Sequence, residues 1–110
     1  MIPANTPEIG IDELARVAQH GATIIDVREP MEYDAGHVPG AVLMPMGQLP
    51  GRTAELGHSA PVYVVCASGN RSAAMSAFLR GAGFDAYSVP GGPSAWARSG
   101  RPIVGRSGRA

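Results

Sequence analysis

The chain has 110 residues, of which 45% are hydrophobic and 16% charged, and these proportions are typical of one compact globular domain. The single cysteine excludes an internal disulfide, so the composition indicates a reduced, cytoplasmic setting and not a disulfide-stapled secreted scaffold. The formal net charge of zero gives no reason to expect nucleic-acid binding, and the short apolar runs give none to expect a membrane span or an export signal.

The predicted elements alternate between helices and strands along the chain. A helix is predicted between Gly10 and Gly21, where apolar residues recur on one helical face, and the β-branched run over 22–27 predicts a strand buried on both faces. A short helix is predicted over 30–35, because proline suits the first turn of a helix and glycine the position after its last. The later predictions are a short strand over 41–45, a helix within 47–57, a strand over 62–65, a helix over 72–81, a strand over 86–89 and a helical turn or two over 94–99.

This alternation, joined by right-handed crossovers, predicts an α/β fold with an open parallel sheet and helices on both faces. We expect one domain over residues 1–110, with an ordered core over about 6–103 and a flexible tail over 104–110. In such folds ligands bind outside the carboxyl ends of the strands. Cys66 directly follows the predicted strand over 62–65, so the sequence puts the candidate site at that edge of the sheet.

The residues around the cysteine are the strongest candidate for a site. In the stretch VYVVCASGNRS, over 62–72, a strand ends at Cys66 and a helix begins after a few small or polar residues. Small residues let the backbone curl around the sulfur, and the N–H groups of such a loop, together with the positive end of the following helix, favour an anion. A thiolate is itself an anion, so the loop predicts a nucleophilic cysteine at neutral pH.

The alternative is that Cys66 packs as a small hydrophobic residue, which is the usual role of a free cysteine. Its position at a strand end, ahead of Ala-Ser-Gly-Asn-Arg-Ser, favours a functional thiol. Sulfur transfer through a persulfide needs no second cysteine, because the outer sulfur leaves with an acceptor from solution. This hypothesis requires that the sulfur is not sealed inside the apolar core.

Three blocks of the sequence resemble the single-domain rhodaneses, which are thiosulfate and persulfide sulfurtransferases. The blocks are IIDVREPMEYDAGHVPGAVLMP over 24–45, the cysteine loop over 66–72 and VPGGPSAW over 89–96, in the order found in the family. The resemblance implies a five-stranded parallel sheet, no cofactor, and Cys66 as the nucleophile that carries the persulfide. It also implies that the backbone N–H groups of the loop hold the terminal sulfur; the loop residues are Ala67, Ser68, Gly69, Asn70 and Arg71.

The charged residues near the loop have two expected roles each. Arg71 either contacts an anionic donor such as thiosulfate or pairs with Asp26 at the neighbouring strand end, and we favour the pair because a guanidinium fork suits a carboxylate. Arg28 is equally compatible with a salt bridge and a substrate contact. Ser72 is expected to satisfy donors at the helix start. Many members of the family carry arginine or lysine where this chain has Ala67, which leaves the natural sulfur donor open.

Other polar and aromatic residues are interpreted as structural. His37, in Gly-His-Val-Pro-Gly, is expected to bond the backbone in a tight turn. Glu29, Glu32 and Asp34 are interpreted as a solvated helix face, and Trp96 as core beneath the cysteine loop. The histidines and the cysteine do not have the spacing of metal ligands, so no metal is predicted.

The predicted function is transfer of a sulfane sulfur from thiosulfate or a persulfide donor to cyanide, a thiol or an acceptor protein. One alternative is a phosphatase or arsenate reductase of the same fold, but the loop between Cys66 and Arg71 is one residue shorter than in the related cell-cycle phosphatases, which suits a single sulfur atom better than a phosphate. Another alternative is a rhodanese-like domain used for binding or regulation. Inactive versions of the domain commonly lack the cysteine that this chain keeps.

Overall fold

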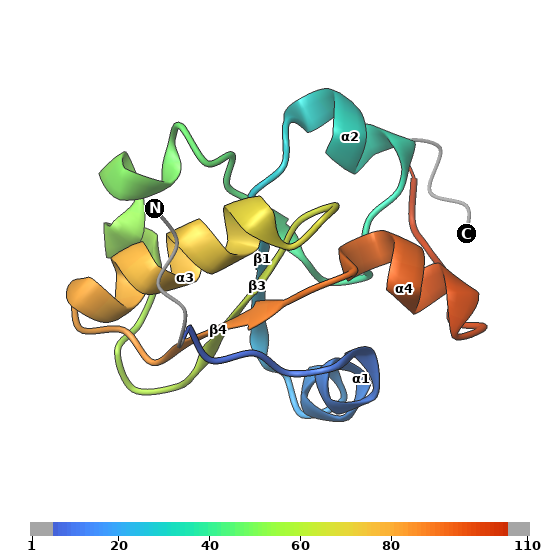
Figure 1. Cartoon of the computed structure of the whole chain (residues 1–110), viewed down its shortest axis with the longest axis horizontal. Coiled ribbons are helices and arrows are strands. Elements are labelled where there is room, and N and C mark those ends of the chain that lie inside the picture. Colours follow the sequence, from blue (N-terminus) through green and yellow to red (C-terminus); the bar gives the residue numbers. More distant parts are fainter. Residues whose placement is uncertain (1–5, 106–110) are drawn as a thin grey trace.

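Four short parallel strands form the centre of the computed structural model, which describes residues 6–105 (Figure 1). They lie in the order β2-β1-β3-β4, and each pairs in parallel with its neighbours. Their register aligns Asp26, Val65 and Val89, so the carboxyl ends of β1, β3 and β4 share one edge. The strands are β1 (Thr23–Asp26), β2 (Val42–Leu43), β3 (Val62–Val65) and β4 (Ala86–Val89).

Helices cover both faces of this sheet, as the sequence predicts. On one face the buried cluster includes residues of α1, α4, β1, β3 and β4, with Leu14 and Trp96 among them. On the other face Leu79 of α3 and Leu49 pack against alternate residues of β1 and β3. Figure 1 shows α2 apart from both, near the carboxyl end of β1. The helices are α1 (Ile11–Ala18), α2 (Pro30–Ala35), α3 (Asn70–Gly81) and α4 (Gly92–Arg98), with 3-10 turns η1 (Leu49–Gly51) and η2 (Thr53–Glu55).

The fold class is confirmed, but the prediction of five strands is wrong: the sheet has four in the described part of the chain. Residues 7–9 lie beside β4, joined to it by a single bridge between Glu8 and Ser88. The Ile9 N–H donates to the Ser88 carbonyl, and the Ser88 N–H donates to the Pro7 carbonyl. Proline lacks an N–H and α1 begins at Ile11, so this segment is too short to form a ladder.

Most other elements agree with the sequence prediction, and the exceptions have local causes. The helix predicted within 47–57 is wrong: the region forms two 3-10 turns separated at Arg52, and Pro50 and Gly51, which disfavour a continuous α-helix, lie in the first of them. Helix α3 begins at Asn70, earlier than predicted. Val104, assigned from sequence to the tail, pairs with His37 through two backbone hydrogen bonds, while 106–110 of that tail lie outside the described residues. Within 6–105 no helix is both long and apolar enough to cross a membrane.

Candidate active site

The loop that follows β3 folds back over the sulfur of Cys66. The N–H of Gly69 donates to Cys66 Sγ at 3.0 Å, and the N–H of Ser72 donates to it at 3.2 Å. Gly69 has φ 98°, in the left-handed region that glycine adopts readily, and this turn leads into α3. The sulfur therefore lies at the amino end of a twelve-residue helix, where the helix dipole favours negative charge.

The other N–H groups of the same loop are weakly bonded or unpaired within residues 6–105. The Asn70 N–H donates weakly to the side chain of Ser68 at 3.4 Å. The N–H groups of Ala67, Ser68 and Arg71 have no hydrogen-bond acceptor among residues 6–105. Unpaired donors around a nucleophile are what a loop needs in order to hold a second negatively polarised atom beside the first.

Cys66 is completely buried, at 0% exposed, and belongs to the apolar cluster on the α3 face. Its sulfur nevertheless contacts polar groups of the loop, and the loop residues Ala67, Ser68 and Asn70 are exposed. The thiol thus belongs to an apolar cluster and also contacts polar groups of the loop. The hypothesis drawn from the sequence requires that the sulfur is not sealed in the core; Cys66 has no exposed area, although its sulfur contacts two loop N–H groups and the Ser72 hydroxyl.

Ser72 does not have the role that the sequence suggests. Helix α3 begins at Asn70 without a side-chain cap, and Ser72 is completely buried behind that start. Its hydroxyl lies 3.4 Å from Cys66 Sγ, 3.2 Å from the Gly69 carbonyl oxygen and 2.8 Å from the hydroxyl of Ser88. Ser88 was missed from the sequence; the one signal that could have found it is a serine within an otherwise apolar, buried strand.

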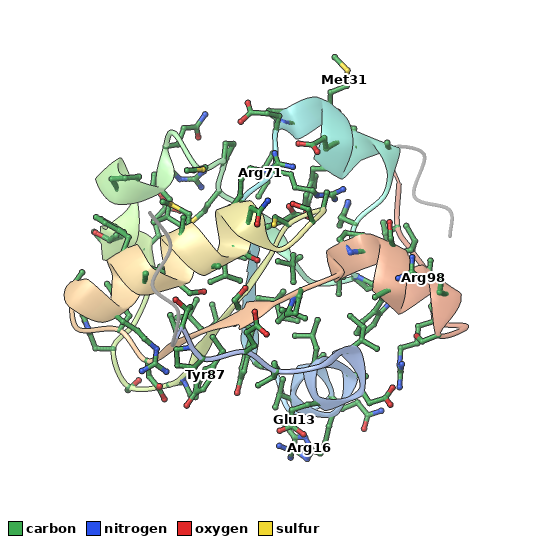
Figure 2. The ribbon with its side chains drawn as sticks, viewed as in Figure 1. Glu13, Arg16, Met31, Arg71, Tyr87 and Arg98 are labelled. Atoms are coloured by element: carbon green, nitrogen blue, oxygen red, sulfur yellow. The ribbon has the colours of Figure 1, made fainter. Side chains whose placement is uncertain are left out.

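Arg71 pairs with Glu32 and not with Asp26, so the favoured sequence prediction is wrong. Its Nη1 and Nη2 donate to the two carboxylate oxygens of Glu32 at 2.8 and 2.9 Å. Figure 2 shows Arg71 between α3 and α2, the helix that carries Glu32. The same carboxylate accepts the N–H of Glu29 at the start of α2. These hydrogen bonds, with that of Arg71 the largest cause, lower the pKa of Glu32 to about 2, and Glu32 in turn raises the pKa of Arg71.

Asp26 is unavailable to Arg71 because Arg28 holds it. The Arg28 Nε and Nη2 donate to the two oxygens of Asp26 at 2.9 Å each, and the Arg28 backbone N–H also donates to Asp26. Nη2 further donates to the carbonyl of Gly36 at 2.8 Å. Both side chains are buried. Of the two roles open for Arg28, the structure therefore gives it the salt bridge.

The structure also locates three residues that are interpreted from sequence as structural. The ring of His37 stacks on Tyr33, with centroids 3.6 Å apart, and its Nδ1 lies 2.9 Å from the Tyr33 carbonyl, which confirms a bond to backbone. Trp96 is buried and donates from Nε1 to the Pro102 carbonyl, but it packs in the cluster on the α1 face and not in the one that contains Cys66. Of the acidic residues expected on a solvated face of α2, Glu32 is instead paired.

The second glycine of VPGGPSAW packs directly against the cysteine. Gly92 has φ 45°, and a Cβ there would lie 1.9 Å from the carbonyl oxygen of Cys66. No residue with a side chain fits without moving the strand end, which ties the start of α4 to the loop. Within 6–105 no three His, Cys, Asp or Glu side chains are grouped so that they could hold a metal ion.

Comparison with known proteins gives one consistent result. The family model for the rhodanese-like domain matches residues 11–99. The thiosulfate sulfurtransferase GlpE of Pseudomonas syringae pv. syringae (strain B728a) is 34% identical over 86 residues, which cover 77% of this chain and 81% of that protein.

Solved structures agree with the family match. A rhodanese-related protein from Thermoplasma volcanium superposes with TM-score 0.82 and 33% identity, covering 89% of this chain and 97% of that one. A thiosulfate sulfurtransferase from Pseudomonas aeruginosa superposes with TM-score 0.84 and 27% identity, covering 94% of this chain but only 21% of that longer one.

Proposed function

Because the chain belongs to the rhodanese-like domain family, we propose that it is a sulfurtransferase that carries sulfur as a persulfide on Cys66. The observation that carries this proposal is the sulfur of Cys66 itself, which accepts two backbone hydrogen bonds at the amino end of α3. Such donors stabilise a thiolate over a thiol, and the thiolate is the attacking form of cysteine. The expected donors are thiosulfate or a persulfide, and the acceptors cyanide, a thiol or a protein thiol in the cytoplasm.

Loading of the sulfur needs no external oxidant. The Cys66 thiolate attacks the outer sulfur of thiosulfate, a bond forms between Sγ and that sulfur, and the bond to the sulfonate sulfur breaks as sulfite leaves with the electron pair. With a persulfide donor, a thiolate leaves instead. The free N–H groups of Ala67, Ser68 and Arg71 are the donors available to the newly bound outer sulfur.

Unloading breaks the S–S bond that loading forms, and the bonding electron pair returns to Sγ. Cyanide or an acceptor thiolate attacks the outer sulfur, and the S–S bond breaks to leave the Cys66 thiolate. The products are thiocyanate or an acceptor persulfide. Because Cys66 has no exposed surface, we propose that the exposed loop residues shift to admit both donor and acceptor.

The charges around the loop bear on which donor is used. Ala67 contributes no charge, and the guanidinium of Arg71 is matched by the carboxylate of Glu32. A thiosulfate dianion therefore meets little uncompensated positive charge at this loop. We expect an alkyl persulfide to load Cys66 at least as fast as thiosulfate does.

Mass spectrometry of the intact protein tests the proposal. After treatment with thiosulfate or glutathione persulfide and removal of excess reagent, the wild type should gain one sulfur atom, and cyanide should remove it as thiocyanate. Cys66→Ser, which changes one atom, should gain none. Absence of any gain with every sulfane donor would contradict the proposal and favour a binding module, and release of phosphate from an aryl phosphate would favour a phosphatase.

A further inference from the structure

Two serines behind Cys66 form a buried hydrogen-bond chain that the sulfur-transfer steps above do not use. Cys66 at the end of β3, Ser72 in α3 and Ser88 in β4 are each 0% exposed. The thiol donates to Ser72 Oγ at 3.4 Å, and Ser72 Oγ lies 2.8 Å from Ser88 Oγ. The chain therefore crosses from one strand through the helix to the next strand, with no solvent at any member.

The number of available hydrogens determines which group donates in each hydrogen bond of this series. The Ser72 hydroxyl has one hydrogen and three neighbours, namely Cys66 Sγ, the Gly69 carbonyl and Ser88 Oγ. Ser88 Oγ has only Ser72 as a partner among the described residues. A buried hydroxyl hydrogen without an acceptor is costly, so the Ser88 hydroxyl donates to Ser72. The hydrogen of Ser72 is then free for Gly69 or for the sulfur.

The two ionisation states of Cys66 use that hydrogen differently. When Cys66 is a thiol, its S–H donates to Ser72 Oγ, and the Ser72 hydroxyl donates to the Gly69 carbonyl. When Cys66 is a thiolate, the Ser72 hydroxyl can turn to donate to the sulfur, which then has three donors with the N–H groups of Gly69 and Ser72. The donation from Ser88 persists in both states and polarises the Ser72 hydroxyl toward the sulfur.

We propose that Ser88 is a positioning residue for the thiolate of Cys66, acting through the hydroxyl of Ser72. The proposal rests on the role of Cys66 as the nucleophile of the proposed function. It predicts that loss of the Ser88 hydroxyl disfavours the thiolate without removing any group that contacts the sulfur.

The charged groups around the cysteine loop are the same in every Ser88 variant. Arg71 of α3 interacts electrostatically with Cys66, and it interacts in turn with Glu32 of α2 and with Glu29 before it. Asp26 and Arg28, at the end of β1, pair with each other. Strand β4 itself contributes no charged side chain in Ala86–Val89. A change in the pH dependence of Cys66 in a Ser88 variant is therefore attributable to the hydroxyl.

The test is the rate of alkylation by iodoacetamide as a function of pH, which requires no sulfur donor. For Ser88→Ala we expect the pH of half-maximal rate to move upward and the rate below it to fall by roughly three- to tenfold, which corresponds to the net worth of one hydrogen bond, while the limiting rate at high pH stays the same. Ser76→Ala is the matched control: Ser76 is buried on the same helix and its hydroxyl has no partner among the described residues. Its profile should coincide with that of the wild type.

Two further comparisons make the result decisive. Ser72→Ala should shift the profile at least as far as Ser88→Ala, and the double variant should shift it no further than Ser72→Ala alone, because Ser88 acts through Ser72. Ser88→Thr and Ser88→Val have the same shape and differ in the hydroxyl, so they carry the test if Ser88→Ala does not fold. Any of four results would overturn the proposal. The profile of Ser88→Ala could coincide with that of the wild type, or its shift could equal that of Ser76→Ala. The profiles of Ser88→Thr and Ser88→Val could be equal, or the shifts could add in the double variant. If sulfur transfer fails, the proposed function is wrong, but the alkylation profiles still test the role of Ser88.

Discussion

Two arginines at the carboxyl edge of the sheet make the same kind of contact in different surroundings. Arg28 holds Asp26 with a two-pronged fork, and Arg71 holds Glu32 in the same way. The side chains of the first pair are 9% and 0% exposed, whereas those of the second are 31% and 36% exposed. The first pair joins residues two apart in the chain, and the second joins residues thirty-nine apart.

The difference between the pairs is energetic and functional. Breaking a buried pair leaves a charge without water or partner, so Asp26 and Arg28 hold the strand end in one conformation. A pair that is a third exposed is partly screened and contributes little to stability. Arg71 belongs to the cysteine loop and Glu32 to α2, so of the two arginine pairs it is the weaker one that joins the candidate site to α2.

The largest effect is expected for the buried pair. Arg28→Ala leaves the Asp26 carboxylate buried and unpaired, which should lower the free energy of unfolding by about 3–5 kcal/mol. Urea denaturation followed by circular dichroism measures this loss. Arg16→Ala is the control, because it removes an arginine from the exposed pair with Glu13 and should leave the denaturation midpoint close to that of the wild type.

A mild effect of Arg28→Ala would mean that Asp26 does not need its partner. Asp26→Asn would then show whether the charge of Asp26 or its shape matters for stability, because the amide keeps the shape and removes the charge. Equal losses in Arg28→Ala and Arg16→Ala would contradict the contrast drawn between buried and exposed pairs.

A smaller effect on stability and a clear one on activity are expected for the second pair. Arg71→Ala should cost about 1 kcal/mol or less in unfolding free energy. By releasing the loop from α2, it should slow persulfide formation on Cys66 by something of the order of tenfold, equivalent to about 1.4 kcal/mol. The rate of sulfur uptake, followed by mass spectrometry with thiosulfate and with an alkyl persulfide, measures this.

The choice of donor distinguishes the two roles of Arg71. If Arg71 only holds the loop, the rate falls equally with both donors. If it also binds thiosulfate, the loss with thiosulfate is greater, and Glu32→Gln, which frees the guanidinium, improves the use of thiosulfate. Unchanged rates in Arg71→Ala would show that the contact with Glu32 is irrelevant to loading.

Sequence alone was sufficient where the signals are local. The strands over 23–26, 62–65 and 86–89 follow from β-branched apolar runs, and the loop after Cys66 from its small residues. Helix α2 follows from Pro30 at its start and Gly36 at its end. Each of these patterns is complete within a few residues, so no knowledge of distant contacts was required.

Sequence reasoning failed where a contact joins segments that are distant in the chain, or where a local contact takes the partner that a distant residue was expected to use. Asp26 and Glu32 are equally good partners for Arg71 by chemistry, but Arg28, two residues from Asp26, occupies that carboxylate first. The pairing of Ser88 with Ser72 depends on how β4 lies against α3, which no local pattern contains. The fifth strand was inferred from resemblance alone, and residues 7–9 make only one bridge there.

The smallest effect concerns the pH dependence of the exposed pair. The pKa of Glu32 lies at about 2 in the folded protein, below its ordinary value of 4.5. Such a carboxylate contributes stability above pH 4.5, and the contribution is lost as the pH falls toward 2. Because the side chain is 36% exposed, we expect at most about 1 kcal/mol.

Glu32→Gln isolates this contribution, because a glutamine oxygen can still accept the N–H of Glu29 at the start of α2 while the charge is removed. Wild type should be the more stable at pH 7, and the difference in urea midpoint should shrink as the pH falls from 4.5 toward 2. A difference that stays constant over this range would mean that packing around residue 32, and not its ion pair with Arg71, accounts for the effect. In that case the backbone of the loop, and not the ion pair between Arg71 and Glu32, would hold the loop in place. Only the buried pair of Arg28 and Asp26 would then contribute to stability through its charges.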